Sequence, residues 1–132
     1  MKDDVGVEIH ALSKFVDERG TLSVLEFQKE IGFTAARLFI IGDTPKNQVR
    51  GNHAHRQSTQ VFLWLEGEIE LTFKSKTKQT THTLSSANNA YLCPPGIWGI
   101  QKFVVPNSKL LVLSDYSYDL DDYITNYQDF LK

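Results

Sequence analysis

A chain of 132 residues has the length of one ordinary domain and is long enough to bury a real apolar core. Its net charge of -2 at pH 7 argues against a general nucleic-acid binder and against a basic protein of membrane surfaces. Hydrophobic residues at 41% and charged residues at 23% are ordinary values for a soluble globular protein. We therefore expect a single domain over residues 1–132.

Short strands between turn signals are predicted through the first half of the chain. Val7–Phe15 precedes the turn cluster Asp-Glu-Arg-Gly, and Thr21–Phe27 resumes a strand pattern. Ala36–Ile41 is a compact apolar run that ends at the turn-forming segment Gly-Asp-Thr-Pro-Lys-Asn. All three segments are too short and too often interrupted by turn formers to predict long helices.

The second half continues the strand pattern until the tail. Gln60–Leu65 and Glu68–Lys74 flank Glu66-Gly67, which is a hairpin signal. Further strands are expected at Thr80–Leu84, Ala90–Cys93, Gln101–Val105 and Lys109–Ser114. In the tail, apolar residues recur at helical spacing, which predicts an amphipathic helix over Asp121–Leu131.

Many short strands at near-regular spacing predict an all-β fold, a jelly-roll β-barrel or sandwich with a short C-terminal helix. Both faces of Gln60–Leu65 are apolar, so we expect this strand to be buried on two sides. A sheet covered on its outer face in this way, with an open edge to protect, predicts a homodimer.

The amino-terminal segment and the single cysteine bear on location. The first ten residues carry charge where a signal peptide needs an apolar run, and no stretch approaches membrane-spanning length. Cys93 is the only cysteine, so no internal disulfide is expected and a reducing compartment fits. These features predict a cytoplasmic protein with no membrane partner.

Two histidines in the segment Arg-Gly-Asn-His-Ala-His are the leading candidates for chemistry. His53 and His55 are two positions apart, so an extended backbone directs both side chains to the same face. A pair of exposed loop histidines is the plainer alternative. The adjacent Arg50, the later Gln60 and the Pro-Pro-Gly turn at 94–96 favour a functional site.

The spacing from Gly51 through His53, His55 and Gln60 to Gly67 resembles the first signature of the cupin superfamily, and Pro94-Pro95-Gly96 resembles the start of the second. In metal-binding cupins a glutamate follows the histidine pair and another histidine follows the second turn. This chain has Gln60 at the first place and no histidine at the second, and a neutral amide is a poor ligand for iron, manganese or zinc. We therefore expect no metal and no cofactor.

More specifically, the chain resembles the nucleotide-sugar 3,4-ketoisomerases, small cupins that act on dTDP-4-oxo-6-deoxyglucose. The resemblance covers almost the whole chain, in these segments: Asp17-Glu18-Arg19-Gly20, Arg37-Leu38-Phe39-Ile40-Ile41, Arg50-Gly51-x-His53-Ala54-His55 with Gln60, Trp98 after the Pro-Gly turn, and the tail from Tyr118 to Tyr127. Two positions depart from the family pattern. Ile40 stands where a tyrosine is frequent and Gly99 where a histidine is frequent, and both are expected to face the sugar.

The resemblance implies isomerisation of a dTDP-linked keto-sugar, in deoxysugar synthesis for a surface polysaccharide. A 4-keto sugar has an acidified hydrogen at C3, so a base, an acid and groups that hold an oxyanion suffice. His53 and His55 are the implied catalytic residues. We favour His53 as the base, since a histidine can take up and return a proton near neutral pH.

The remaining candidates are implied contacts to the substrate. Arginine suits a diphosphate because its guanidinium donates two parallel hydrogen bonds. The candidate substrate-binding residues are Arg19, Arg37, Arg50, Asn52, Gln60, Tyr91 and Trp98. Surface charge is an equal alternative for Arg19, and packing in the apolar core is the alternative for Trp98 and the default for Tyr91. Arg56 is expected to be a solvated surface residue.

Two other functions stay open at this point. A nucleotide-sugar 3,5-epimerase is also a metal-free barrel, but it would need a second acid and base that reach C5. A non-catalytic sugar-binding cupin would keep the fold without the chemistry. Product analysis separates the epimerase, and exchange of the C3 hydrogen in heavy water separates the binding protein.

Overall fold

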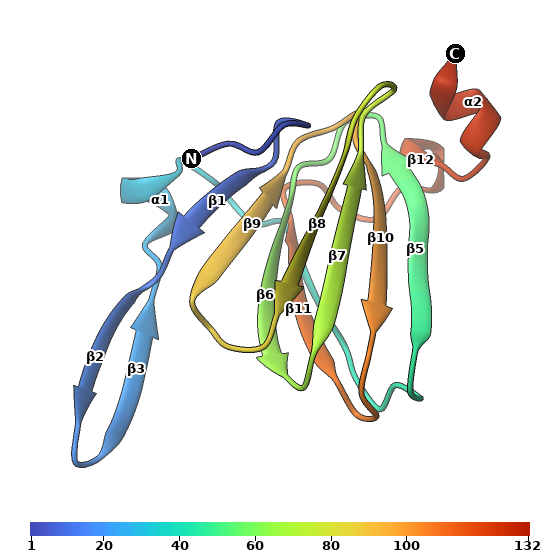
Figure 1. Cartoon of the computed structure of the whole chain (residues 1–132). Coiled ribbons are helices and arrows are strands. Elements are labelled where there is room, and N and C mark those ends of the chain that lie inside the picture. Colours follow the sequence, from blue (N-terminus) through green and yellow to red (C-terminus); the bar gives the residue numbers. More distant parts are fainter.

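The computed structural model describes residues 1–132 and has two five-stranded antiparallel sheets that face each other (Figure 1). The first sheet has the strand order β1-β9-β6-β11-β4, and the second has the order β12-β5-β10-β7-β8. The first sheet comprises β1 (Glu8–Ala11), β9 (Asn89–Cys93), β6 (Gln60–Glu66), β11 (Lys109–Ser114) and β4 (Arg37–Ile41). The second comprises β12 (Tyr123–Ile124), β5 (Gln48–His55), β10 (Trp98–Phe103), β7 (Ile69–Lys74) and β8 (Gln79–Leu84).

From β4 to β11 the chain passes back and forth between the sheets: β4, β6, β9 and β11 belong to the first sheet, whereas β5, β7, β8 and β10 belong to the second. This nested exchange is the jelly-roll arrangement, and the predicted all-β class is correct. The two sheets are not closed into a continuous barrel, so the fold is an open sandwich. None of the helices is long and apolar enough to cross a membrane.

The main core lies between the sheets and follows strand periodicity. In β7 the residues Ile69, Leu71 and Phe73 are fully buried, while the alternating positions are only partly covered. This is the alternation that the sequence predicts for a half-buried strand. The same cluster contains Phe62 of β6 and Phe103 of β10, so both sheets supply it with aromatic side chains.

Strand β6 is apolar on both faces, as predicted from Gln60–Leu65. Phe62 and Trp64 pack with the main core, whereas Val61 and Leu63 belong to a second apolar cluster on the outer face of the first sheet. Helix α1 (Phe27–Glu30) and the residues around it cover part of that outer face. Cover by α1 was not anticipated, because the sequence predicted a strand as far as Phe27.

The N-terminal strands differ from the prediction in a second way. The expected single strand Val7–Phe15 divides into β1 and β2 (Ser13–Asp17), and β2 pairs only with β3 (Gly20–Val24). These two strands form a hairpin that projects away from the sandwich (Figure 1). Every residue of β2 is exposed, so the hairpin gains little from packing within its own chain.

The tail is less helical than predicted for Asp121–Leu131. A 3-10 turn (Leu120–Asp122) leads into β12, and helix α2 covers only Tyr127–Leu131. The side chains of Asp119 and Asn126 accept hydrogen bonds from the backbone at the start of each helical segment, which divides the tail into two short pieces. Phe130 of α2 then packs against Trp98 on the outer face of the second sheet.

Candidate active site

Strand β5 carries a bulge that brings its functional side chains to one face. Arg50 and His53 are three positions apart, so a regular strand would direct them to opposite sides. The pairing with β10 shifts at this point, so that Ile100 faces Gly51, Gly99 faces His53 and Asn52 is an extra residue. Gly51 and Asn52 have φ angles of 83° and 58°, a left-handed region that glycine and asparagine tolerate.

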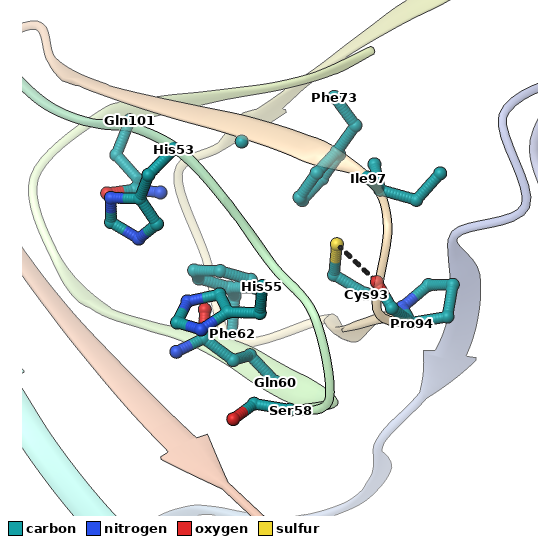
Figure 2. Close-up of a pocket in the computed structure, with 11 residues that line it drawn as sticks. His53, His55, Ser58, Gln60, Phe62, Phe73, Cys93, Pro94, Ile97 and Gln101 are labelled. Carbon is teal, nitrogen blue, oxygen red and sulfur yellow. Dashed lines mark hydrogen bonds between the residues drawn. The ribbon is translucent and has the colours of Figure 1, made fainter. Parts of the chain in front are cut away.

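Two adjoining hollows open between the sheets on this side of β5. The inner hollow is narrow, with a free volume of about 10 Å³, and both histidines line it (Figure 2). The outer hollow is larger, at about 270 Å³, and is lined by Arg37 and Arg50 as well as His53. The hollows share four residues, which are His53, Gln60, Phe62 and Gln101. An elongated ligand therefore has room for its anionic end near the arginines and for a small ring near His53.

A buried carboxylate holds His55 in place. Asp122 accepts a hydrogen bond from His55 Nδ1 at 2.8 Å, from Ser58 Oγ at 2.6 Å and from the backbone N–H of Gln57 at 2.6 Å. Burial by itself would raise the pKa of Asp122, but these hydrogen bonds and the adjacent His55 lower it to about 2. The carboxylate is therefore ionised at neutral pH and keeps the proton of His55 on Nδ1.

The other ring nitrogen of His55 is free for chemistry. His55 Nε2 is buried and has no hydrogen-bond partner within the chain. Since His55 lines the inner hollow, Nε2 is available to an oxygen or a proton of a bound ligand. With Nδ1 held by Asp122, the neutral ring presents an acceptor at Nε2 and the charged ring presents a donor.

The surroundings of His53 favour its neutral form. Burial lowers its pKa, the nearby His55 lowers it further, and the Gly51 carbonyl offsets part of the effect. The imidazole of His53 is therefore unprotonated at neutral pH. Its ring lies 5.0 Å from the ring of His55 and 5.0 Å from that of Tyr123, measured between centroids. These edge contacts fix the ring at the boundary of the two hollows.

Aromatic rings hold Arg37 at the outer hollow. Its guanidinium lies over the rings of Phe39 and Tyr118, at 5.1 and 5.5 Å from their centroids, and donates to Tyr123 Oη at 3.3 Å. Arg50 makes no ion pair within the chain and also lines the outer hollow. Two guanidinium groups therefore border the same space and are available to an anion.

Four of the predicted substrate-binding residues lie outside both hollows. Trp98 is buried and contacts Tyr127 and Phe130, which agrees with the alternative of apolar packing. Tyr91 is buried in the main core beside His82. Asn52 is the exposed residue of the β5 bulge, and Arg19 is exposed at the tip of the β2–β3 hairpin in an ion pair with Asp17.

Two further expectations need correction. Ile40 was expected to face the sugar, but it is 54% exposed and lies on the outer face of β4, whereas its neighbours Phe39 and Ile41 line the outer hollow. The alternation of side chains along a strand accounts for the difference. Arg56 is exposed but not free, because it donates to the carbonyls of Asp121 and Tyr123 at 3.0 and 2.8 Å.

The sequence matches the WxcM-like, C-terminal family over residues 5–132. The chain belongs to this family. It is 31% identical over 119 residues to TDP-4-oxo-6-deoxy-alpha-D-glucose-3,4-oxoisomerase of Aneurinibacillus thermoaerophilus, which covers 90% of this chain and 86% of the relative.

Two solved structures are similar over 95% of this chain. One is a 3,4-ketoisomerase from Helicobacter canadensis, with a TM-score of 0.88, 30% identity and 94% of that chain covered. The other is a mutant of the 3,4-ketoisomerase QdtA from Thermoanaerobacterium thermosaccharolyticum in complex with TDP-4-keto-6-deoxyglucose, with a TM-score of 0.88, 26% identity and 91% of that chain covered. A 3'-monoepimerase from Streptomyces bikiniensis shares 11% identity, which shows a common fold alone.

Several residues of the site were not identified from the sequence. Asp122 and Ser58 hold His55, Tyr123 contacts both histidine rings, and Gln101 lines both hollows. Asp122 lies 67 residues after His55, so no local spacing connects the two. The available signal was the buried periodicity of β10, which places Gln101 on the same face as Phe103 and opposite Ile100.

We expect Asp122→Asn to destabilise the fold in a pH-dependent way. A pKa lowered from 3.8 to about 2 corresponds to roughly 2–3 kcal/mol, which is present above pH 4 and is lost as the pH falls from 4 towards 2. Urea unfolding at pH 7 should show this deficit relative to the parent, and the gap should narrow as the pH approaches 3. Asp121→Asn, at an exposed neighbour, is the control. A deficit that stays constant down to pH 3 would contradict the assigned ionisation.

Proposed function

We propose that this chain is a nucleotide-sugar 3,4-ketoisomerase that converts a dTDP-4-oxo-6-deoxyhexose into the dTDP-3-oxo-6-deoxyhexose. The observation that carries the proposal is the placing of His53 and His55 in one hollow, with two arginines bordering the larger hollow beside it. The relatives named above as TDP-sugar 3,4-ketoisomerases support the same assignment. The epimerase alternative has only a shared fold in its favour.

The proposed reaction moves two hydrogens and no other atom. His53 removes the proton on C3, the electron pair forms a C3–C4 double bond, and the C4 carbonyl becomes an enediolate oxygen. His53 then returns the proton to C4, which leaves a ketone at C3. The hydroxyl proton on O3 leaves and O4 gains one, so that atoms and electrons balance. The lowered pKa of His53 supports its role as the base, because the neutral imidazole is the competent form.

His55 is suited to the hydroxyl proton. Its Nε2 is free within the inner hollow while Asp122 holds the opposite nitrogen. A neutral ring accepts the O3 proton at Nε2, and the resulting imidazolium, stabilised by the ionised Asp122, donates a proton to O4. Asp122 acts in this scheme as a positioning residue, since it contacts His55 and not the sugar.

The diphosphate is assigned to the outer hollow. Arg50 is available there without an intramolecular ion pair, and Arg37 is held beside it by Phe39 and Tyr118. Guanidinium groups bind phosphate oxygens through paired hydrogen bonds, so these two residues suit a pyrophosphate link. Gln60 lines both hollows and is assigned to a sugar oxygen. None of these steps requires a metal, and we propose that the reaction is metal-independent.

A homodimer is proposed from the apolar outer face of the first sheet. Leu63, Leu111 and Ile40 are direct partners across β6, β11 and β4, and they continue the row beyond the part that α1 covers. Ile40 and Leu38 are each 54% exposed, and leaving this apolar surface in water is unfavourable in free energy for a chain in isolation. A second copy would cover this row, and it would also give the exposed apolar residues of the β2–β3 hairpin a surface on which to pack.

The hairpin bears on Arg19 as well. This arginine is exposed at the hairpin tip and borders neither hollow of its own chain. A contact between Arg19 and substrate would therefore have to come from the second copy.

The proposed place of the reaction is the cytoplasm, in deoxysugar synthesis for a surface polysaccharide such as lipopolysaccharide. The buried free thiol of Cys93 suits that reducing compartment.

The purified protein should convert dTDP-4-oxo-6-deoxyglucose into the 3-oxo isomer, and dialysis against a strong chelator should leave this turnover unchanged.

His53→Asn and His55→Asn should bind dTDP nearly as well as the parent while turnover falls about a hundredfold or more. His53→Asn should also lose exchange of the C3 hydrogen with heavy water. A product that keeps its ketone at C4 would indicate an epimerase, and an absence of C3 exchange in the parent would indicate a binding protein.

Arg50→Ala should weaken dTDP binding by roughly 1.5–3 kcal/mol, the usual contribution of a charge-assisted hydrogen bond. Titration calorimetry measures the change directly. Because Arg56 binds the tail, the suitable charge-matched control is Lys78→Ala, an exposed residue in the turn between β7 and β8. Equal losses in both variants would mean that only general electrostatic attraction operates.

Light scattering at micromolar concentration should give about twice the 15.0 kDa mass of the chain. Ile40→Glu should shift the protein towards the monomer, since it places a charge in the apolar row. Val105→Glu introduces the same charge at another partly exposed apolar position and should leave the mass unchanged. A monomeric parent, or equal effects of the two variants, would rule out this interface.

A further inference from the structure

Gln101 is a buried polar residue in the middle of the site that the steps above leave without a task. It belongs to β10, which lies between β5 and β7 in the second sheet, and it is 7% exposed. Its side chain lines both the inner and the outer hollow. A side-chain amide that faces a hollow offers a ligand both a donor and an acceptor. Here the space beside the amide is the hollow itself.

The backbone around Gln101 is shaped to admit this side chain. A Cβ atom at Gly51 would lie 2.9 Å from both Nε2 and Oε1 of Gln101, which is closer than real Cβ contacts allow. A Cβ atom at Gly99 would lie 3.7 Å from Nε2, in ordinary contact. The amide therefore occupies space that glycine leaves open at position 51, and the absence of a side chain at Gly99 leaves one flank of it uncovered.

Gln101 lies close to the residues that are assigned to the two ends of the proposed ligand. Gln101 pairs directly with Arg50 across β5 and β10, and two residues earlier Gly99 pairs with His53. Its amide thus lies between the arginine assigned to the diphosphate and the histidine assigned to the C3 proton. Figure 2 shows Gln101 and His53 directed into the same space.

Gln60 reaches this space from the opposite sheet. Gln60 lies on β6 of the first sheet and Gln101 on β10 of the second, and both line the two hollows. Two carboxamides therefore face one ligand space from two sides. A sugar has hydroxyl groups on both sides of its ring, and an amide both donates and accepts, which matches this arrangement.

We propose that Gln101 contacts the substrate and donates a hydrogen bond from Nε2 to the sugar oxygen on C4, where negative charge develops as His53 removes the C3 proton. The inference rests on the proposed isomerase function. A donor already in position near a forming oxyanion strengthens its contact as charge builds up, so Gln101 stabilises the enediolate more than it stabilises the ground state. Together with Gln60 it fixes which ring face His53 meets.

The test uses Gln101→Met, which keeps an unbranched side chain of similar size and removes the donor. Calorimetry with dTDP and with dTDP-6-deoxyglucose, which has no ketone and cannot react, isolates the contribution of the sugar. Gln101→Met should bind dTDP like the parent and the dTDP-sugar about three- to tenfold more weakly. Turnover and C3 exchange of the 4-oxo substrate should fall about ten- to a hundredfold, more in kcat than in KM. Gln79→Met, an exposed glutamine of the same sheet, should match the parent in all readouts.

The outcomes separate this inference from the function on which it rests. If the parent turns over the 4-oxo substrate and Gln101→Met retains parental sugar binding and kcat, then Gln101 is not a substrate contact. If the parent shows neither turnover nor C3 exchange but Gln101→Met loses sugar affinity, the isomerase proposal fails and the contact stands. Loss of dTDP binding would indicate a folding defect, and Gln101→Leu then repeats the test. Loss of dTDP binding in both variants would assign Gln101 a structural role and overturn the proposal.

Discussion

The geometry of the site depends on the Asp122 carboxylate. It joins the tail to β5 by accepting hydrogen bonds from His55, Ser58 and the backbone of Gln57, all within a buried environment. The short strand β12 pairs with β5 immediately after it, and Arg56 of the β5–β6 turn binds carbonyls on both sides of Asp122. One ionised group therefore fixes the direction of the His55 ring and holds the tail segment against β5.

The lining of the hollow depends on the bulge in β5, because the bulge changes which side chains of the strand face inward. A regular β5 would separate Arg50 from the histidines, and the bulge at Gly51 and Asn52 removes that separation. The same glycine leaves space for Gln101. Arginines, carboxamides and histidines therefore line one continuous space on this side of β5.

Most of what could be predicted from the sequence came from the hydrophobic periodicity of the strands. The alternation in β7 and the two apolar faces of β6 depend on local burial, so they are visible in the residues themselves. Asp122 was missed because its role arises from a contact with His55, which lies 67 residues away in the sequence. Asn52 lies outside the site because it is the extra residue of the bulge, and Ile40 lies outside it because the alternation along β4 turns it to the outer face.

The nested order of the strands also has a kinetic consequence. The β7–β8 hairpin is the most local pairing of the sandwich, and around it lie β6 with β9, then β5 with β10, and finally the tail on β5. Loop-closure entropy delays each wider pairing until the narrower ones have formed. The contact of His55 with Asp122, 67 residues apart, belongs to the wide pairings, as do β4 with β11 and β1 with β9. The orientation of the His55 ring therefore depends on the closure of a long loop, whereas the β7–β8 hairpin at the centre of the nest needs only a short one.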